Sequence, residues 1–131
     1  MNAFLRWCRF NAVGVAGMAV QLAVLAALNR IAPEHYLINT AAAIEVTLAH
    51  NFFWHLRYTW RDRDAAPLAE RYVRFQLSNG AVSLAGNLVL MKLLVQCEHL
   101  PVLVANGVAI VVCSLVNFCL GDRWVFANTT V

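Results

Sequence analysis

Two long stretches of this sequence contain no charged residue. One covers residues 10–29 and the other covers residues 100–121. An α-helix rises about 1.5 Å per residue, so each stretch can form a helix of about 30 Å, the thickness of the hydrocarbon core of a bilayer. Charged residues make up 13% of the chain, compared with about 25% in typical soluble domains. The sequence therefore predicts a protein built from membrane-spanning helices.

Two further apolar stretches are expected to span the membrane. Residues 36–56 would form the second span, which carries one acidic residue, Glu45, near its middle. Residues 75–91 would form the third, with Lys92 at its end, where a long side chain can reach the membrane surface. The whole chain, residues 1–131, is therefore predicted to be one all-α transmembrane domain with four helices.

The second and fourth spans end in the same ten-residue design. Each apolar run closes with asparagine and phenylalanine, and an arginine among aromatic residues follows six positions after the asparagine. The two copies cover residues 51–60 and 117–126. The identical positions are Asn51 and Asn117, Phe52 and Phe118, and Arg57 and Arg123.

A second repeated motif opens the first and third spans. Arginine, an aromatic residue, a second arginine and phenylalanine occur in residues 6–10 and again in residues 71–75. Both motifs recur in the same order, which predicts a tandem duplication of a two-helix unit. We place repeat one at about 6–63 and repeat two at about 71–127, joined through a polar loop at about 57–74.

The basic residues are distributed unevenly between the two sides of the predicted membrane domain. Arg30 and Lys92 lie on one side, and the other eight lie on the opposite side. Lysine and arginine accumulate in cytoplasmic segments, so both termini and the 57–74 loop are predicted to be cytoplasmic. The two repeats would then share one topology, as in transporters built from parallel repeats. The eight residues are Arg6, Arg9, Arg57, Arg61, Arg63, Arg71, Arg74 and Arg123.

The paired motifs resemble those of the GtrA-like family of small four-helix bacterial membrane proteins. The resemblance extends from about Arg6 to Phe126 and rests on both motifs occurring twice. It implies a multi-pass protein of the bacterial cytoplasmic membrane that moves or presents polyprenyl-phosphate-linked sugars for cell-envelope polysaccharides. A membrane glycosyltransferase is the protein partner that such a role implies.

Four duplicated arginines, two from each repeat, are candidate ligands for a lipid phosphate. Arginine presents a planar fork of donors that suits a phosphate group, and all four are expected at the same depth in the membrane. The alternative is that they only fix the orientation of the helices, as arginines at cytoplasmic helix ends do. The candidates are Arg9, Arg57, Arg74 and Arg123.

Asn51 and Asn117 are candidate polar contacts beside those arginines. If the helix continues, Asn117 and Trp124 lie seven residues apart on one face, and Asn51 and Tyr58 repeat that arrangement. Such a stripe would hold a polar headgroup beside an aromatic ring. The alternative is that the amides join helices and that the aromatic residues anchor the helix ends at the interface.

Glu45 is a candidate proton or cavity site. A carboxylate near the bilayer centre costs roughly 2.5 kcal/mol or more, so we expect this side chain to be buried between helices or to face a wet cavity. The alternative is a structural hydrogen bond to another helix, at Gln21, Asn87 or Asn106. The equivalent residue of repeat two is Val111, so Glu45 is not part of the duplicated design.

The sequence contains no recognisable catalytic or metal-binding motif. His50 and His55 are five residues apart and do not share a helix face, and the four cysteines form no CxxC pair. We expect the cysteines to be small buried apolar residues, and we predict no metal, no cofactor and no enzymatic activity. The net charge is only +3 and the sequence has no arginine-rich face, so we do not expect a nucleic-acid partner.

The leading functional prediction is a protein that helps to translocate a polyprenyl-phosphate-linked sugar through the membrane lipid. One alternative is a membrane anchor or scaffold for a glycosyltransferase, which would move nothing itself. A small multidrug-type exporter also has four helices and a membrane glutamate, but such exporters usually carry that residue in the first helix. Four helices enclose little space, so a homo-oligomer stays an open alternative.

The orientation can be tested by cysteine labelling in a background where the native cysteines are replaced. An Asp64→Cys variant is expected to react with a membrane-impermeant thiol reagent only from the cytoplasmic side, because the basic loop is retained there. A Glu34→Cys variant, in the turn after the first span, should react from outside. Labelling of Asp64→Cys from outside intact cells would refute the predicted topology.

Overall fold

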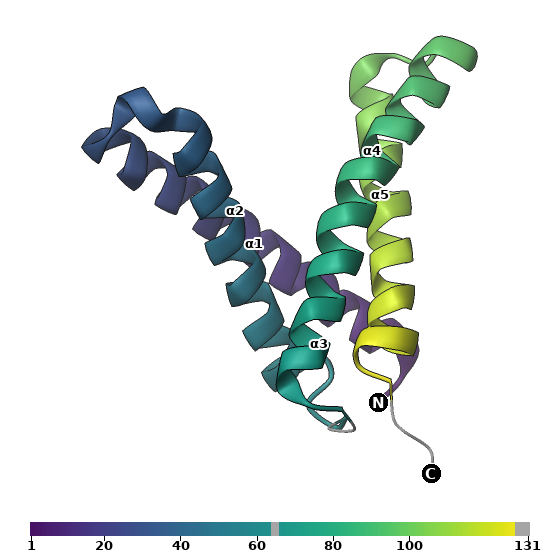
Figure 1. Ribbon diagram of the computed structural model, residues 1–131. Helices are drawn as coiled ribbons and strands as arrows, with labels where there is room; N and C mark the ends of the chain where they lie inside the picture. The colour runs from purple at the N-terminus through teal and green to yellow at the C-terminus, as the bar shows by residue number, and fades with distance from the viewer. Residues whose placement is uncertain (64–65, 128–131) are drawn as a thin grey trace. The chain divides into compact units, whose positions relative to one another are not determined.

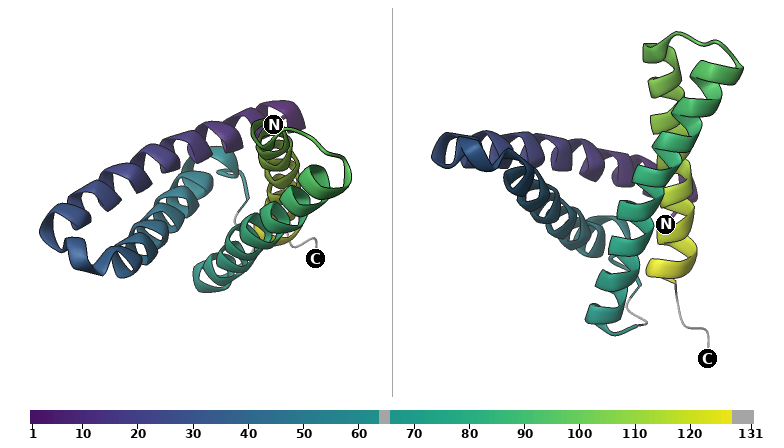
Figure 2. Two further views of the ribbon diagram at one scale, coloured as in Figure 1. Left: turned by 90° about the horizontal axis from the view of Figure 1, so that it is seen from above. Right: turned by 45° about the horizontal axis from the view of Figure 1, so that its top comes forward.

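The computed structural model describes residues 1–63 and 66–127, apart from the side chains at positions 36, 37, 102, 103 and 106. The chain divides into two compact units, Met1–Asp62 and Arg63–Val131. In its described part, each unit consists of two long helical arms that lie side by side and run in opposite directions (Figure 1, Figure 2). The division falls in the polar connection, so each unit corresponds to one predicted repeat.

In the first unit, the arms are formed by two long helices. α1 (Ala3–Ile31) ends before a proline, which has no amide hydrogen to continue the helical bonding. The short 3₁₀ turn η1 (Pro33–His35) leads into α2 (Tyr36–Trp54). α2 continues without a break into a turn of π-helix, η2 (His55–Thr59), so the second arm extends beyond the apolar run itself.

In the second unit, the first arm is one continuous helix, Leu68–Cys97, in which α-helical and π-helical geometry alternate. The second arm begins after Pro101, a residue tolerated at the start of a helix because the first amide groups there have no partner within it. The first arm contains, in chain order, α3 (Leu68–Phe75), η3 (Gln76–Ala81), α4 (Val82–Lys92) and η4 (Leu93–Cys97). The second arm contains α5 (Val102–Leu120) and η5 (Gly121–Val125).

The change from α-helix to π-helix occurs at the same point in both repeats. α2 ends at Trp54 and α5 ends at the equivalent Leu120, and a five-residue π-helical turn follows each. The residue after each turn, Trp60 or Phe126, is buried. It donates its amide hydrogen to the first carbonyl of the turn, at 2.8 Å in the first unit and 2.9 Å in the second. The duplication seen in the sequence therefore extends to the helix geometry.

The core of each unit contains a stripe of buried residues at every fourth position of the second arm. Ala43 in α2 and its equivalent Ala109 in α5 both have no exposed surface. Small residues let two helix backbones approach closely, which is how membrane helices gain packing contacts. The buried positions of the stripe are Asn39, Ala43 and Thr47 in the first unit and Ala105, Ala109, Cys113 and Asn117 in the second.

Within the described part of the chain, three helical segments are long and apolar enough to cross a membrane. They are Ala3–Ile31, Leu68–Cys97 and Gly107–Val125, and they overlap the first, third and fourth predicted spans. The second predicted span is helical, as α2, but it is not among these three segments. The count of four spans therefore stays a prediction.

The polar connection is shorter than the predicted 57–74 loop. Residues 55–59 still belong to the second arm of the first unit, and α3 already contains the last residues of the predicted loop. Arg71 and Phe75, one helical turn apart in α3, are both buried. The charged residues of α3 therefore lie on a helix that packs within its unit, and not in a loop. Asp64, within the predicted loop, lies outside the described residues.

Exposed apolar side chains cover both arms of each unit, as helices that face lipid require. Leu22 in α1 and Leu84 in α4 are 66% and 68% exposed. The cysteines follow the same trend and differ from the expectation of burial, because only Cys113 is buried among the four. The other three, Cys8, Cys97 and Cys119, lie on exposed helix surfaces.

Gly17 is expected to be required for the packing of α1 against α2. A Cβ atom at this position would lie 2.2 Å from Oδ1 of Asn51, so a Gly17→Ala substitution must displace the asparagine amide. We expect the variant to be less stable than the matched Gly14→Ala variant by about 1–3 kcal/mol of unfolding free energy, the usual cost of an overpacked site. Unfolding of the purified protein in a denaturing detergent would measure the loss.

Gly14→Ala is the matched control in the same helix. A Cβ atom at this position would meet no other atom within 4 Å. Alanine is favoured over glycine in a helix by about 1 kcal/mol, so this variant should be as stable as the wild type or more stable. An equal loss in both variants would show that the close approach at Gly17 does not stabilise the helix pair.

Candidate functional site

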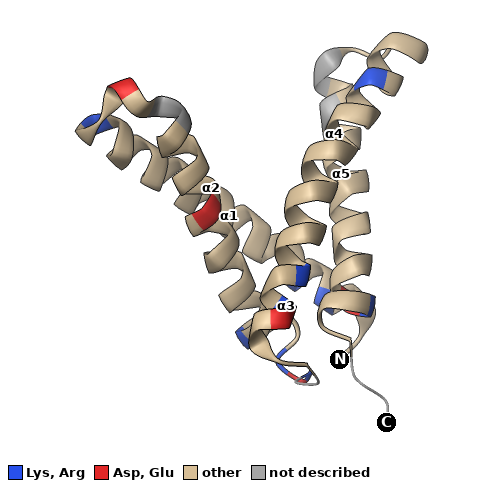
Figure 3. Ribbon diagram, viewed as in Figure 1, with Lys and Arg blue, Asp and Glu red and all other residues tan. Residues whose placement is uncertain are grey.

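Charge is concentrated at one end of each unit (Figure 3). In the first unit, the N-terminal amine and Nη2 of Arg6 lie 4.0 Å and 3.6 Å from the carboxylate of Asp62. In the second unit, Arg63 forms an ion pair with Asp122 at 3.1 Å. The beginning and the end of each unit therefore meet, as expected for a repeat that starts and ends on one side of a membrane. That this side is cytoplasmic stays a prediction.

The π-helical turns η2 and η5 lie at these charged ends. The last carbonyl groups of a helix have no amide partner within it, and near a bilayer they need another donor. Tyr58 in η2 and Trp124 in η5 occupy the same position of the turn and present such carbonyls. Both side chains are exposed, at 44% and 40%.

Arg9 and Arg74 supply donors to these carbonyls. Nη1 of Arg9 donates to the carbonyl oxygen of Tyr58 at 3.2 Å. Nη1 of Arg74 donates to the carbonyl oxygen of Trp124 at 3.0 Å. The same guanidinium groups lie over the rings of those two residues, 4.6 Å and 5.7 Å from the ring centroids. Each arginine therefore links the first arm of its unit to the end of the second arm through a hydrogen bond and a cation–π contact.

Arg57 and Arg123 have a different environment, although they also coincide in the duplicated motif. Both side chains are exposed. Arg57 lies over the ring of Phe53 at 5.2 Å, and neither guanidinium makes a hydrogen bond or an ion pair with the residues that the structure describes. The four arginines predicted as one set are therefore two pairs. Arg9 and Arg74 bind the chain itself, whereas no described residue occupies the donors of Arg57 and Arg123.

A third pair of duplicated arginines is buried and was not among the predicted site residues. Arg6 and Arg71 are 7% and 3% exposed. Nη2 of Arg71 donates to the carbonyl oxygen of Arg63 at 3.0 Å, and its guanidinium lies 5.2 Å from the centroid of the Phe126 ring. With the pairing of Arg6 and Asp62, these contacts hold the polar connection against each unit. The sequence signal was present, because each arginine begins the second repeated motif.

Aromatic residues buried beneath the turns fix the position of the exposed arginines. Phe10 stacks on His55 with the ring centroids 4.9 Å apart, and the ring of Trp60 lies edge-on to both. In the second unit, the rings of Phe75 and Phe126 pack with centroids 6.3 Å apart. A ligand-binding side chain is held more accurately on a packed helix than on a loop. The aromatic packing beneath the turns therefore holds the backbone at Arg57 and Arg123 in place.

Asn51 and Asn117 hold helices together in the structure. Nδ2 of Asn117 donates to the hydroxyl of Ser83 on α4 at 2.7 Å. The amide of Asn51 packs closely against Gly17 on α1. The single face expected for Asn117 and Trp124 is not found, because the helix widens into a π-helical turn between them. Asn117 is 7% exposed, whereas Trp124 is 40% exposed.

Glu45 lies on the side of α2 that faces away from α1. Ala43 and Thr47, two residues before and after it, are buried. Two residues rotate by roughly 200° in an α-helix, so Glu45 points to the opposite side and is exposed within its unit. The expected burial between helices is therefore not found in the first unit. Among the alternative partners, the side chain of Asn106 lies outside the described residues.

A Glu45→Gln variant is expected to keep the fold. The side chain is exposed within its unit, and the amide has the shape of the carboxyl group that it replaces. The free energy of unfolding should change by less than about 0.5 kcal/mol, the usual range for surface substitutions. A proton role predicts that the variant loses the pH dependence of the wild-type activity. A pH profile that matches the wild type would rule out that role.

Comparison with known families connects this geometry to relatives. The family model described as "GtrA/DPMS, transmembrane domain" matches residues 9–126. The matched region begins at Arg9 and ends at Phe126, so it contains all six candidate arginine and asparagine residues. This confirms the resemblance indicated by the repeated motifs. No curated protein is significantly similar in sequence to this chain.

Proposed function

The chain belongs to the GtrA/DPMS transmembrane-domain family, and on that premise we propose that it binds the phosphate of a polyprenyl-phosphate-linked sugar and helps to move that lipid across the bacterial cytoplasmic membrane. Family membership and the apolar helices make it a membrane protein of lipid-linked sugar processing. Translocation, the bacterial membrane and the polyprenyl carrier are our proposal. The proposed role includes no covalent step, and a membrane glycosyltransferase that uses the same carrier is the proposed partner.

The observation that carries this proposal is the division of the duplicated arginines. Arg6, Arg71, Arg9 and Arg74 contact the chain itself, and these contacts explain why they recur. Arg57 and Arg123 recur just as regularly, yet they have no hydrogen bond or ion pair within residues 1–63 and 66–127. A repeated cation with free donors at the charged end of each unit suits an anionic ligand from outside the chain.

A lipid phosphate is the anion that fits this position. The arginines stand on helical turns that directly continue the apolar arms, so a ligand there can keep its apolar part in lipid and its phosphate at the interface. A guanidinium group binds phosphate through two parallel, charge-assisted hydrogen bonds. Lysine offers the same charge as a single ammonium and cannot reproduce that planar fork. The proposal therefore depends on arginine itself and not only on positive charge.

We expect Arg57→Lys and Arg123→Lys to insert normally but to bind a polyprenyl phosphate more weakly. The positive charge that sets topology is retained, whereas one charge-assisted hydrogen bond is lost, which costs on the order of 1–2 kcal/mol and about tenfold in affinity. Alanine at the same positions should weaken binding further. Binding to the purified protein and movement of a labelled polyprenyl-phosphate sugar between liposome leaflets are the measurements.

Two arginines outside the duplicated motifs provide matched controls. Arg61→Lys changes an exposed arginine at the same end of the first unit, and Arg30→Lys changes one at the other end of α1. Both variants should bind as the wild type does. Equal binding by the wild type, Arg57→Lys and Arg123→Lys, with correct insertion, would show that the duplicated arginines only set orientation. A scaffold for a glycosyltransferase would then be the better function.

A further inference from the structure

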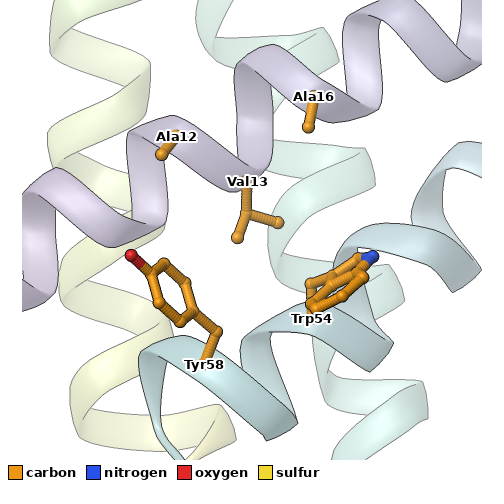
Figure 4. Close-up of a pocket in the computed structure, with 5 residues that line it drawn as sticks. All are labelled: Ala12, Val13, Ala16, Trp54 and Tyr58. Atoms are coloured by element: carbon orange, nitrogen blue, oxygen red, sulfur yellow. The ribbon is translucent and has the colours of Figure 1, made fainter.

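A narrow apolar recess lies between the two arms of the first unit (Figure 4). Its volume is about 240 Å³, and its surface is almost entirely apolar. Ala12, Val13 and Ala16 project from α1 on one side, and Trp54 and Tyr58 project from the second arm on the other. The recess can therefore accept an apolar group but offers little to a polar one.

The recess exists because small and large residues oppose each other at helical spacing. Ala12 and Ala16 are four residues apart on α1, and Trp54 and Tyr58 are four residues apart on the facing arm. On α1 this spacing places both alanines on one face of the helix, and the close-up shows the two rings of the second arm directed at that face (Figure 4). Two methyl groups opposite two rings leave an open space at the surface that a larger side chain on α1 would occupy.

The second repeat has the same frame, but four of the five equivalent lining residues differ, including those at the positions of Ala12 and Trp54. Leu77 stands where the first repeat has Ala12, and Leu120 stands where it has Trp54. The hydrogen bond from arginine to the carbonyl of the turn is nevertheless present in both repeats. The pairing of Ala12 with Trp54 is therefore particular to the first repeat and is not required to close a hairpin.

One end of the recess adjoins positive charge. Tyr58 lines the recess, and the guanidinium of Arg9 lies over its ring. Arg57 is the neighbour of Tyr58 in η2, and its exposed guanidinium has no hydrogen bond or ion pair among the described residues. An apolar recess with the guanidinium group of Arg9 at one end, and a second arginine on the next residue of the turn, is complementary to an apolar chain that ends in a phosphate.

We propose that this recess binds the isoprene units nearest the phosphate of the polyprenyl chain, with the phosphate held by the donors of Arg57 and attracted by the positive charge of Arg9. This inference rests on the proposed function and adds which repeat holds the chain. The volume lies below the roughly 300 Å³ of a small ligand pocket, which suits part of a chain and not a sugar. Lipid tails are as apolar as the recess, so selectivity comes from packing of the branched chain against two rigid rings.

Photo-crosslinking tests the placement of the chain. The probe is a polyprenyl phosphate with a diazirine on its first isoprene units, added to the full chain in phosphatidylcholine vesicles. Adducts are expected in residues 54–58 and not in the equivalent residues 120–124, which act as an internal control in the same molecule. Ala12→Leu and Trp54→Leu each install the residue of the second repeat. Each should reduce the adducts in 54–58 by about fivefold, because leucine at position 12 occupies the recess and leucine at position 54 removes the ring that the chain contacts.

Controls separate the recess from the proposed function. Ala26→Leu adds the same bulk at an exposed position of α1 outside the recess and should leave the adduct yield unchanged. Unlabelled polyprenyl phosphate should compete, whereas phosphatidylglycerol and inorganic phosphate should not. Equal adducts in both segments, unchanged adducts in Ala12→Leu and Trp54→Leu, or full competition by phosphatidylglycerol would overturn the recess proposal while binding at the arginines stands. Failure of the wild type to bind polyprenyl phosphate at all would overturn both proposals.

Discussion

The carbonyl groups at the end of each second arm are the constraint on which the rest of the structure depends. Near a bilayer such groups cannot be left without donors. In both repeats an arginine of the opposing arm meets them, Arg9 at Tyr58 and Arg74 at Trp124. This contact fixes where the first arm must begin relative to the end of the second arm, and it brings a buried phenylalanine beneath each turn. Each hairpin is therefore closed at its charged end by a contact that lipid could not replace.

Much of this arrangement can be predicted because it depends on patterns along the amino-acid sequence. Charge-free stretches identify helices long enough to span a bilayer, and the structure contains three such helical segments among the described residues. Repeated spacing predicts a duplication, since equivalent positions of two hairpins have equivalent neighbours. Repetition cannot show which residues of a motif make contacts within the protein and which are exposed. Arg9 and Arg57 look alike in the sequence, yet one binds a carbonyl oxygen and the other is exposed.

The π-helical turns and the position of Glu45 show two further limits. The change of helix geometry after Trp54 lies at a helix end, and π-helical turns are too rare to be expected from a sequence alone. Faces inferred from α-helical periodicity therefore fail beyond that residue. Glu45 is a different case, because Ala43 and Thr47 already form a stripe of small residues on the opposite face. The spacing of those small residues indicates that Glu45 faces away from α1. The expectation of burial rested instead on the cost of placing a carboxylate in lipid.

Positions that differ between the repeats separate the structural role of the duplication from its functional role. The link from arginine to carbonyl is kept in both repeats because each hairpin needs it to close. Ala12 and Trp54 are replaced by Leu77 and Leu120, and neither pair takes part in that link. A lipid with one phosphate and one chain has no twofold symmetry, so one repeat is enough to hold its chain. Divergence between the repeats is therefore expected where the chain of the lipid lies, and in the first unit that place is the recess beside Tyr58.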